Sequence, residues 1–376
     1  MHQLVVHFFV FLLILQAMPK QTQIIHDMFQ IKGGGERLVI AMCQGLDTDL
    51  LTAHIGPNTF DLSQINGDVI NLDALSRIHG IKTWRLAKAF KNLKTEQNCY
   101  EQIIYSGVAS PLAVHHFPTA KNIFYCHTPP RFVYDKKSYY ADGFNPLKRM
   151  AFNLLVNWFK PQYEKAIKQM DVVLTNSHYV QARIKSTTGL DAAVIHPPCD
   201  THRFKWIAQG DYYLSMARHD DLKRIDSIIK AFLKMPDKKL IIASGGGQTD
   251  ALKRIAGNAK NISFTGWLNE AKMMSLLGNC LATIYVPLDE DFGMTPVESM
   301  SAGKPVICSN HGGLLETVID GVTGYFVSSE NLVNDIIQKV NLLSNNHQAS
   351  LMRSACEERA GSFDTQLFLK KLKEFL

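Results

Sequence analysis

Short apolar runs of strand type alternate with helical stretches along almost the whole chain, and this alternation constrains the fold most strongly. Alternating strands and helices favour a parallel sheet covered by helices on both faces, so we predict an α/β fold. The predicted strands cover residues 23–26, 51–55, 102–105, 122–126, 172–175 and 193–196 in the first half, and 212–216, 239–243, 262–265, 281–286, 305–308 and 324–327 in the second.

A stiff connection separates the two halves. The sequence I-H-P-P-C-D at 195–200 contains consecutive prolines, which stop regular structure and stiffen a linker. A length of 376 residues is sufficient for two domains. We therefore predict an N-terminal Rossmann-like domain over 21–198 and a second Rossmann-like domain over 199–355.

The start of the first domain resembles the first βα unit of a nucleotide-binding fold. A strand at 23–26 is followed by a predicted glycine turn, G-G-G-E-R at 33–37, and by a helix over 38–44. This turn lacks the G-x-G-x-x-G spacing of dinucleotide-binding proteins, which disfavours a dehydrogenase. Gly33, Gly34 and Gly35 would bring backbone amides close to a donor phosphate or an acceptor, although a plain tight turn is the alternative.

The amino-acid composition agrees with a globular protein, and the net charge indicates which kinds of partner it binds. The hydrophobic share is 46% and the charged share 20%, which is ordinary for soluble domains. The net charge of +6 is mild and dispersed, so we predict an anionic ligand or a membrane surface rather than nucleic acid. The seven cysteines are scattered without a C-x-x-C pair, which favours reduced cytosolic thiols over disulfides or a zinc site.

The N-terminus is unusual because residues 4–17 are almost wholly apolar. This run is about the size of a signal-peptide core and shorter than the roughly 20 residues that a membrane-spanning helix needs. No Lys or Arg precedes it. Two explanations stay open for residues 1–20: the true chain opens at Met18, or the extension associates weakly with a membrane.

The sequence E-D-F-G-M-T-P-V-E at 290–298 places two carboxylates eight residues apart around a predicted helix start. Thr295 is a suitable N-cap, Pro296 suits the first helical position, and Glu298 completes a T-x-x-E capping box. The amino end of such a helix favours anions such as phosphate, and Gly293 allows close approach of the backbone. The alternative is that Glu298 only caps its helix and Glu290 is a solvated loop acid.

This E-x7-E element, with its inner D-F-G-M-T-P-V-E, resembles the donor-site signature of retaining glycosyltransferases of the GT-B type, family four, and the resemblance runs from about residue 23 to the C-terminus. It implies two Rossmann-like domains facing a central cleft, with a C-terminal helix within 356–376 that crosses back to the first domain. It also implies that Glu298 binds the ribose of a nucleotide sugar and Glu290 the hexose. The connecting residues Phe292, Gly293, Met294 and Thr295 would complete this part of the donor site.

The stretch C-H-T-P-P-R-F-V-Y-D at 126–135 resembles the H-T/S-P-x-R-x-x-W-D stretch of family members that transfer mannose from GDP-mannose in bacterial polysaccharide assembly, lipopolysaccharide included. Tyr134 replaces the usual Trp. The resemblance implies that His127 contacts the donor sugar, while Arg131 and Asp135 shape the acceptor or donor pocket. The acceptor would be a saccharide or a lipid-linked glycan.

Two cations follow the predicted strand at 212–216, namely Arg218 and Lys223. They could neutralise a diphosphate as its bond to the sugar breaks, and the resemblance assigns them that role. The alternative is a solvated cationic turn, because two aspartates lie between them. Trp267 and Leu268 stand where the family holds the nucleotide base, with core packing as their alternative.

Neither a metal nor another cofactor is predicted beyond the nucleotide-sugar co-substrate. The D-x-D pattern at 289–291 runs directly into the helix start rather than following an early strand, so we do not assign it to manganese. For retention, we favour a front-face reaction in which the departing phosphate oxygen deprotonates the acceptor, over a double displacement. A nucleotide-sugar epimerase or hydrolase, or a non-catalytic binding protein, stays an alternative on the same scaffold.

Residues 144–170 are predicted to be helical, with apolar side chains on one face and several lysines nearby. An amphipathic helix that packs on its own domain is one interpretation. A basic, aromatic surface that meets a membrane or a lipid-linked acceptor is the other. We therefore expect a cytoplasmic enzyme, peripheral on the inner face of the cytoplasmic membrane if the second interpretation holds.

Overall fold

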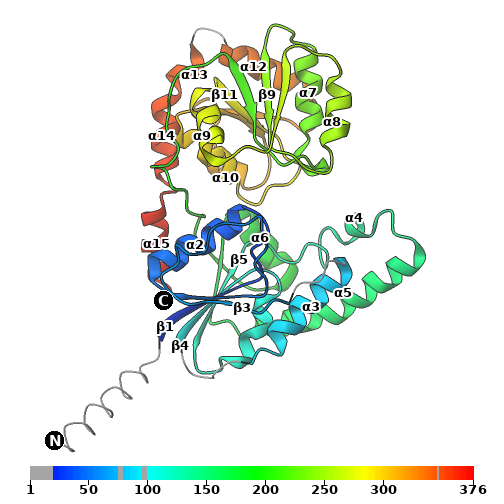
Figure 1. Cartoon of the computed structure of the whole chain (residues 1–376), viewed down its shortest axis with the longest axis vertical. Helices are drawn as coiled ribbons and strands as arrows, with labels where there is room; N and C mark the ends of the chain where they lie inside the picture. The colour runs from blue at the N-terminus through cyan, green and yellow to red at the C-terminus, as the bar shows by residue number, and fades with distance from the viewer. Residues whose placement is uncertain (1–19, 75–78, 95–99, 345–346) are drawn as a thin grey trace, which may run out of the picture. The chain divides into compact units, whose positions relative to one another are not determined.

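The computed structural model describes residues 20–74, 79–94, 100–344 and 347–376, which form two compact units (Figure 1). The first unit extends to Asn176 and adds Gln181–Ile195 and Lys371–Leu376. The second holds Ser177–Val180 and His196–Lys370. The change of unit between Ile195 and His196 falls inside the proline-containing stretch.

The first unit is built on a parallel sheet of seven strands in the order β3-β2-β1-β4-β5-β6-β7. This order reverses between β1 and β4, which is the point where Rossmann-like sheets place their ligands. The strands are β1 (Lys20–His26), β2 (Asp49–Thr52), β3 (Val69–Asn71), β4 (Tyr100–Ser106), β5 (Lys121–Cys126), β6 (Val172–Thr175) and β7 (Ala193–Val194).

Helical segments connect these strands. They are α2 (Gly34–Leu46), α3 (His79–Lys91), the 3-10 helix η1 (Ser110–His116), α4 (Lys137–Ala141), α5 (Pro146–Ile167) and α6 (His178–Thr188). In Figure 1, α4 and the amino end of α5 extend away from the sheet of their unit. The predicted turn at 33–37 is wrong, because α2 already begins at Gly34 and these glycines form its first turn.

The second unit contains a parallel sheet of six strands in the order β10-β9-β8-β11-β12-β13. Its strands are β8 (Tyr212–Ser215), β9 (Lys239–Ala243), β10 (Ile262–Gly266), β11 (Ala282–Tyr285), β12 (Val306–Ser309) and β13 (Gly324–Val327). Its helices are η2 (Asp221–Lys223), α7 (Ile225–Leu233), α8 (Thr249–Ala256), α9 (Glu270–Asn279), α10 (Met294–Ser301), α11 (Leu314–Thr317), α12 (Leu332–Ser344), α13 (Gln348–Leu351), α14 (Arg353–Gly361) and α15 (Thr365–Lys373). The predicted α/β class with two Rossmann-like sheets is confirmed.

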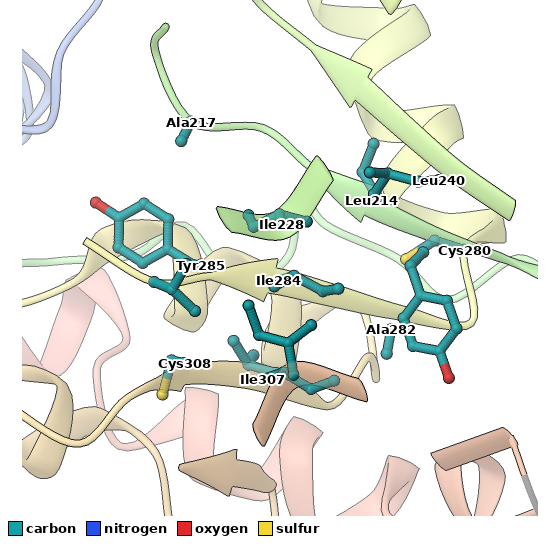
Figure 2. Packing of buried hydrophobic residues seen from close by; sticks show 14 of the residues in the cluster. Leu214, Ala217, Ile228, Leu240, Cys280, Ala282, Ile284, Tyr285, Ile307 and Cys308 are labelled. Carbon is teal, nitrogen blue, oxygen red and sulfur yellow. The ribbon is translucent and has the colours of Figure 1, made fainter. Parts of the chain in front are cut away.

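The central strands of the second unit are buried from both sides, as expected of a parallel sheet with helices on both faces. Leu214, Ile284 and Ile307 from three neighbouring strands pack together in its core (Figure 2). Tyr285 ends β11, and Figure 2 shows its hydroxyl directed away from these aliphatic side chains. The core thus fixes the strand and presents a polar atom at its carboxyl end.

The chain returns to the first unit at its end, within α15, because Lys371–Leu376 group with that unit. There the Lys121 ammonium donates a hydrogen bond to the carbonyl oxygen of Leu376 (3.0 Å). Residues 356–370 of the predicted C-terminal segment belong to the second unit instead.

The apolar run at 4–17 and Cys99 lie outside the described residues. Across the ranges that the structure does describe, no helix is both long and apolar enough to cross a membrane. The cysteines found there, Cys43, Cys126, Cys199, Cys280, Cys308 and Cys356, are free and buried.

Candidate active site

The helix start at the E-x7-E element differs from the prediction. α10 begins at Met294, and Gly293 is its N-cap with a left-handed φ of 99° and no side-chain capping bond. A Cβ on Gly293 would lie 2.6 Å from the Leu314 side chain, so only glycine suits this position. The predicted Thr295–Glu298 capping box is therefore wrong, since both residues lie inside the helix.

Lys223 and Glu290 were assigned different parts of the donor, and the structure brings them into contact. The Lys223 ammonium donates to Glu290 Oε2 at 2.8 Å and to the Tyr285 hydroxyl at 2.7 Å. Tyr285 in turn donates to the same Oε2 at 2.5 Å. The Lys223 and Glu290 side chains keep 22% and 18% of their surface exposed, so the pair remains open to a ligand.

Tyr285 is the residue at this site that the sequence argument missed. Its burial, followed by the negative charges of Glu290, Asp220 and Glu298, raises its pKa well above the usual range. The phenol therefore keeps its proton and donates to Glu290. Of these three carboxylates, Glu290 contacts the hydroxyl directly at the end of β11. A tyrosine at the next-to-last position of the predicted strand 281–286, five residues before Glu290, was the available signal.

Arg218 lies on the loop after β8 but outside this triad. Its guanidinium makes two hydrogen bonds to Asp220 Oδ2, at 3.0 and 2.8 Å, and 56% of its side chain is exposed. The solvated-turn interpretation thus describes its contacts here. An exposed guanidinium paired with one carboxylate can still exchange that partner for a phosphate, because both groups offer two oxygen atoms that accept hydrogen bonds from the guanidinium in a bidentate manner.

Arg224 holds the loop that carries Glu290, a role that the sequence argument did not foresee. Its guanidinium donates to the carbonyl oxygens of Val286 (2.7 Å) and Pro287 (3.1 Å) and to Ser309 Oγ (2.9 Å). These bonds tie the segment after η2 to the carboxyl ends of β11 and β12. Burial lowers the pKa of Arg224, but guanidinium groups stay charged in proteins.

The glycine pair at 312–313 supports the same loop from the other side. The Gly313 amide donates to the Glu290 carbonyl oxygen at 3.0 Å. A Cβ on Gly312 would lie 2.4 Å from that oxygen, and one on Gly313 would lie 2.3 Å from the Asp291 carbonyl oxygen. Glycine is therefore required for two backbones to approach here, and the Gly313 amide is used within the protein.

The residues that follow Glu290 make contacts within the protein. Phe292 is buried and stacks on His196 with ring centroids 5.3 Å apart, so only its backbone can reach a donor. Met294 packs against the core, and the Thr295 carbonyl oxygen accepts a hydrogen bond from Ser299 Oγ (2.9 Å). Their predicted contact with the donor stays a prediction.

Trp267 lies at the carboxyl end of β10, and 73% of it is exposed. Core packing is therefore excluded for Trp267, whereas Leu268 packs partly against the core. The indole Nε1 would lie 2.7 Å from a Cβ on Gly245, so the ring rests on the glycine backbone that follows β9. An exposed aromatic ring that packs on the backbone of its own domain is suited to stack on a planar ligand.

His127 follows β5 in the first unit and is partly buried. Its Nε2 lies 2.8 Å from Ser106 Oγ, at the end of the neighbouring strand β4. The ring also packs beside Gly35, where a Cβ would lie 3.6 Å from His127 Cε1. Burial, followed by the charge of His26, lowers the pKa of His127 to about 3. The imidazole is neutral at neutral pH, and two predicted residues, Gly35 and His127, are neighbours. Gly34 is an exposed residue of the same helical turn.

Arg131 and Asp135 form an ion pair in the first unit, with a shortest distance of 2.7 Å. A second guanidinium, that of Arg183, lies 3.8 Å from the same carboxylate and donates to Thr128 Oγ1 at 2.8 Å. Arg183 comes from α6, which the motif at 126–135 could not reveal. The roles predicted for Arg131 and Asp135 stay predictions.

No group of three or more His, Cys, Asp and Glu side chains within the described ranges is arranged to hold a metal ion. Asp289 of the D-x-D pattern accepts a hydrogen bond from the Tyr179 hydroxyl (3.1 Å). A surface hollow of the second unit is lined by Leu233, Pro236, Ala256, Asn258, Ala259, Lys260 and Asn261, at the amino ends of β9 and β10. It therefore lies at the sheet edge opposite the strand ends that carry Tyr285.

Sequence comparison identifies the second unit. Residues 200–362 match the family described as Glycosyl transferases group 1. The alpha-1,3/1,6-mannosyltransferase ALG2 of Dictyostelium discoideum is 26% identical over 275 residues, covering 60% of this chain and 63% of that protein. ALG2 of Mus musculus is 24% identical over 395 residues, covering 89% and 92%. The match thus spans under two thirds of the first relative and nearly all of the second.

Solved structures share the whole fold. Sucrose-phosphate synthase from Thermosynechococcus elongatus superimposes with a TM-score of 0.76 at 17% identity, covering 94% of this chain and 98% of that one. Anabaena HepE, solved in complex with UDP-glucose, gives a TM-score of 0.70 at 17% identity and covers 94% and 99%. At these identities the likeness concerns the fold alone. Residues 200–362 of the second unit thus match the group 1 glycosyl transferases, and the chain has the GT-B fold of these solved structures.

Proposed function

We propose that this enzyme transfers mannose from GDP-mannose to a saccharide or lipid-linked glycan acceptor, with retention of the anomeric configuration, in the assembly of a cell-surface glycan. The similarity to ALG2 mannosyltransferases supports mannose as the sugar. The stretch at 126–135 supports GDP-mannose as the donor, and the surface-glycan pathway, lipopolysaccharide among the candidates, rests on that resemblance alone. The arrangement of Lys223, Tyr285 and Glu290 carries the proposal for the chemistry.

The Glu290 carboxylate is suited to hold sugar hydroxyls. In the part of the chain that the structure describes, its contacts with Lys223 and Tyr285 both use Oε2. Oε1 is thereby oriented and left to accept hydrogen bonds from hydroxyl groups of the hexose. Glu298 would bind the ribose in the same way, and the exposed Trp267 ring would stack on the base.

Charge on the leaving group would be balanced by protein cations rather than by a metal ion or another cofactor. Lys223 already faces the Glu290 carboxylate, and Arg218 can exchange Asp220 for a phosphate oxygen. As the glycosidic bond breaks, these cations would stabilise the negative charge that develops on the diphosphate. The departing phosphate oxygen would then accept the proton of the acceptor hydroxyl, while His127 contacts the transferred sugar.

The test incubates the full chain with labelled GDP-mannose, GDP-glucose, UDP-glucose and UDP-galactose, with and without a lipid-linked glycan acceptor. We expect acceptor-dependent transfer from GDP-mannose, and NMR of the product should show the donor's anomeric configuration. Epimer formation, acceptor-independent hydrolysis or binding without turnover would each overturn the proposal. Glu290→Ala and Lys223→Ala should abolish most turnover, whereas Lys234→Ala, at an exposed lysine after α7, should not.

We also propose that the amino half of α5 and the preceding α4 form a membrane-docking surface that brings the enzyme to a lipid-linked acceptor. The buried side chains of α5 lie between the midpoint of the helix and its carboxyl end: Val156, Phe159, Tyr163, Ala166 and Ile167. Packing on its own domain thus accounts for that half only. Large apolar side chains are exposed in the amino half of α5, namely Leu147, Met150 and Leu154. Others are exposed in α4 and in the segment before α5, namely Tyr139, Tyr140 and Phe144.

The basic residues on this docking surface indicate that it binds a membrane with anionic lipids. Lys136, Lys137, Lys148 and Arg149 lie among the exposed apolar residues, so the surface complements anionic lipid headgroups. Leu147, Met150 and Leu154 recur at helical spacing and therefore share one face of α5. Such a surface would keep a cytoplasmic enzyme peripheral on the inner face of the membrane.

Vesicle co-sedimentation tests the docking surface. The chain should bind vesicles of phosphatidylglycerol and phosphatidylcholine more strongly than vesicles of phosphatidylcholine alone. Replacing both Leu147 and Leu154 by Ser should weaken binding roughly thirtyfold, at about 1 kcal/mol for each partly inserted leucine. Leu351→Ser is the matched control, because Leu351 in the second unit is 72% exposed and Leu147 is 70% exposed. Unchanged binding of the double variant would refute the assignment of this surface.

A further inference from the structure

Three neighbouring strands of the first unit end in side chains that touch one another. β1 ends at His26, β4 ends at Ser106, and His127 directly follows β5. The register pairs His26 with Ser106, and Ser106 with Tyr125 of β5. Since the strand order reverses between β1 and β4, the cluster lies at the point of the sheet where ligands bind.

The hydrogen bonds of this cluster determine where the hydrogen atoms lie. His26 Nδ1 is 2.9 Å from the Ser106 carbonyl oxygen, which can only accept, so Nδ1 must carry a hydrogen. The same Nδ1 is 3.2 Å from Ser106 Oγ. Oγ can therefore accept from His26, and its own hydrogen remains to be placed.

Ser106 is fully buried, so its hydroxyl hydrogen requires an acceptor inside the protein. Among the residues that the structure describes, the other contact of Ser106 Oγ is His127 Nε2, at 2.8 Å. If Nε2 instead carried a hydrogen, two N–H groups would point at one oxygen and the serine hydrogen would lack a partner. Leaving a buried polar group unpaired costs about 1–3 kcal/mol.

We propose that His26 and Ser106 are positioning residues that hold His127 as its neutral Nδ1–H tautomer, so that His127 serves the transferred sugar as a hydrogen-bond donor and not as a base. The proposal rests on the proposed function only for the identity of the group that receives the hydrogen bond. Burial lowers the pKa values of His26 and His127 to about 4 and about 3, which agrees with two neutral rings.

The tautomer explains what His127 can offer a ligand. Nε2 is engaged by Ser106, while Nδ1–H belongs to a partly exposed ring that lies beside Gly35. A neutral N–H can donate to a sugar hydroxyl without adding a charge near the anomeric carbon. A proton-accepting role would need a free ring nitrogen, and this tautomer leaves none.

The experiment measures the tautomer directly by nitrogen-15 NMR of the imidazole rings in the full chain without ligand. His127→Gln assigns the His127 signals. We expect Nδ1 of His127 to be protonated and Nε2 to be unprotonated. Ser106→Ala should shift the ring to a mixture of tautomers, as should His26→Ala, whereas His26→Asn should preserve the native signal because its amide nitrogen replaces Nδ1.

A matched control and a kinetic measurement exclude a purely structural effect. Tyr105→Phe removes a buried hydroxyl from the adjacent residue of β4, which bonds Asn122 Oδ1 (2.7 Å), and should leave the tautomer unchanged. Ser106→Ala should lower kcat about tenfold, the value of one lost hydrogen bond, with KM for the donor little changed.

A wild-type ring protonated at Nε2, or a tautomer unaffected by Ser106→Ala, would overturn the proposal. The NMR readout uses no substrate, so a wrong assignment of the sugar or acceptor would leave its result intact.

Discussion

Replacement of Tyr285 by Phe tests the triad by removing one oxygen atom. The ring would stay in its buried place at the end of β11, since Phe has the same shape without the hydroxyl. Two hydrogen bonds would be lost, one to Glu290 Oε2 and one from the Lys223 ammonium. The Lys223–Glu290 bond of 2.8 Å would remain.

The expected magnitude follows from these contacts. Hydrogen bonds to charged groups contribute about 1.5–3 kcal/mol each. Lys223 and Glu290 stay bonded to each other and are about a fifth exposed, so water can replace part of the loss. We therefore expect the free energy of unfolding to fall by about 1–2 kcal/mol. Turnover should fall roughly 5- to 30-fold by the same energy, because Glu290 loses one of two groups that orient its carboxylate.

Urea denaturation and steady-state kinetics with the identified donor measure the two effects. Tyr213→Phe is the control, since its buried hydroxyl bonds the Val340 carbonyl oxygen (2.6 Å) in the same unit, away from Glu290. It should lose similar stability and keep its turnover. Unchanged turnover in Tyr285→Phe, or an equal loss in Tyr213→Phe, would refute the reasoning.

Three further changes have expected outcomes. Gly35→Ala should stabilise the first turn of α2 by about 0.5–1 kcal/mol yet reduce turnover, because the new methyl group fills space beside His127 Cε1. Thermal denaturation measures the stability and steady-state kinetics the turnover, and an unchanged turnover would contradict the presence of a ligand beside Gly35. Trp267→Ala should leave stability nearly unchanged at this exposed position but weaken calorimetric binding of GDP about tenfold, the loss of one stacking contact. Burial lowers the pKa of His26 from 6.5 to about 4, so between these pH values the unfolded chain binds a proton that the folded chain does not. The free energy of unfolding should therefore fall as pH drops through this window, and less steeply in His26→Asn; parallel profiles would contradict the assignment.

Much of the fold could be predicted because parallel strands are continuous apolar runs. The structure confirms strands at 172–175, 239–243 and 324–327 with the predicted bounds. β3 was missed because only three residues form it, Val69–Asn71, which is shorter than the apolar runs by which a strand is recognised in a sequence. The start of α10 was misplaced by two residues: propensity favoured Thr295 as the N-cap, but the N-cap in the structure is Gly293, which has a left-handed φ and packs against Leu314.

Residues of the candidate site could be predicted only where they belong to a recognisable sequence motif. Glu290 and Lys223 were each identified, but their contact was not, because 67 positions separate them in the chain. Ser106 and Arg224 lie in no recognisable motif. Their importance comes from the strand ends beside them, which local sequence does not reveal.

The sequence by itself determined that two parallel sheets form, since alternating apolar and helical segments leave few other ways to bury the strands. It also determined which charged residues stand at strand ends. Only the tertiary structure decided that Tyr285 lies between Lys223 and Glu290, and that Ser106 links His26 to His127. The order of the strands in each sheet determines which of these residues come into contact. That order results from how the connecting helices pack across the whole sheet.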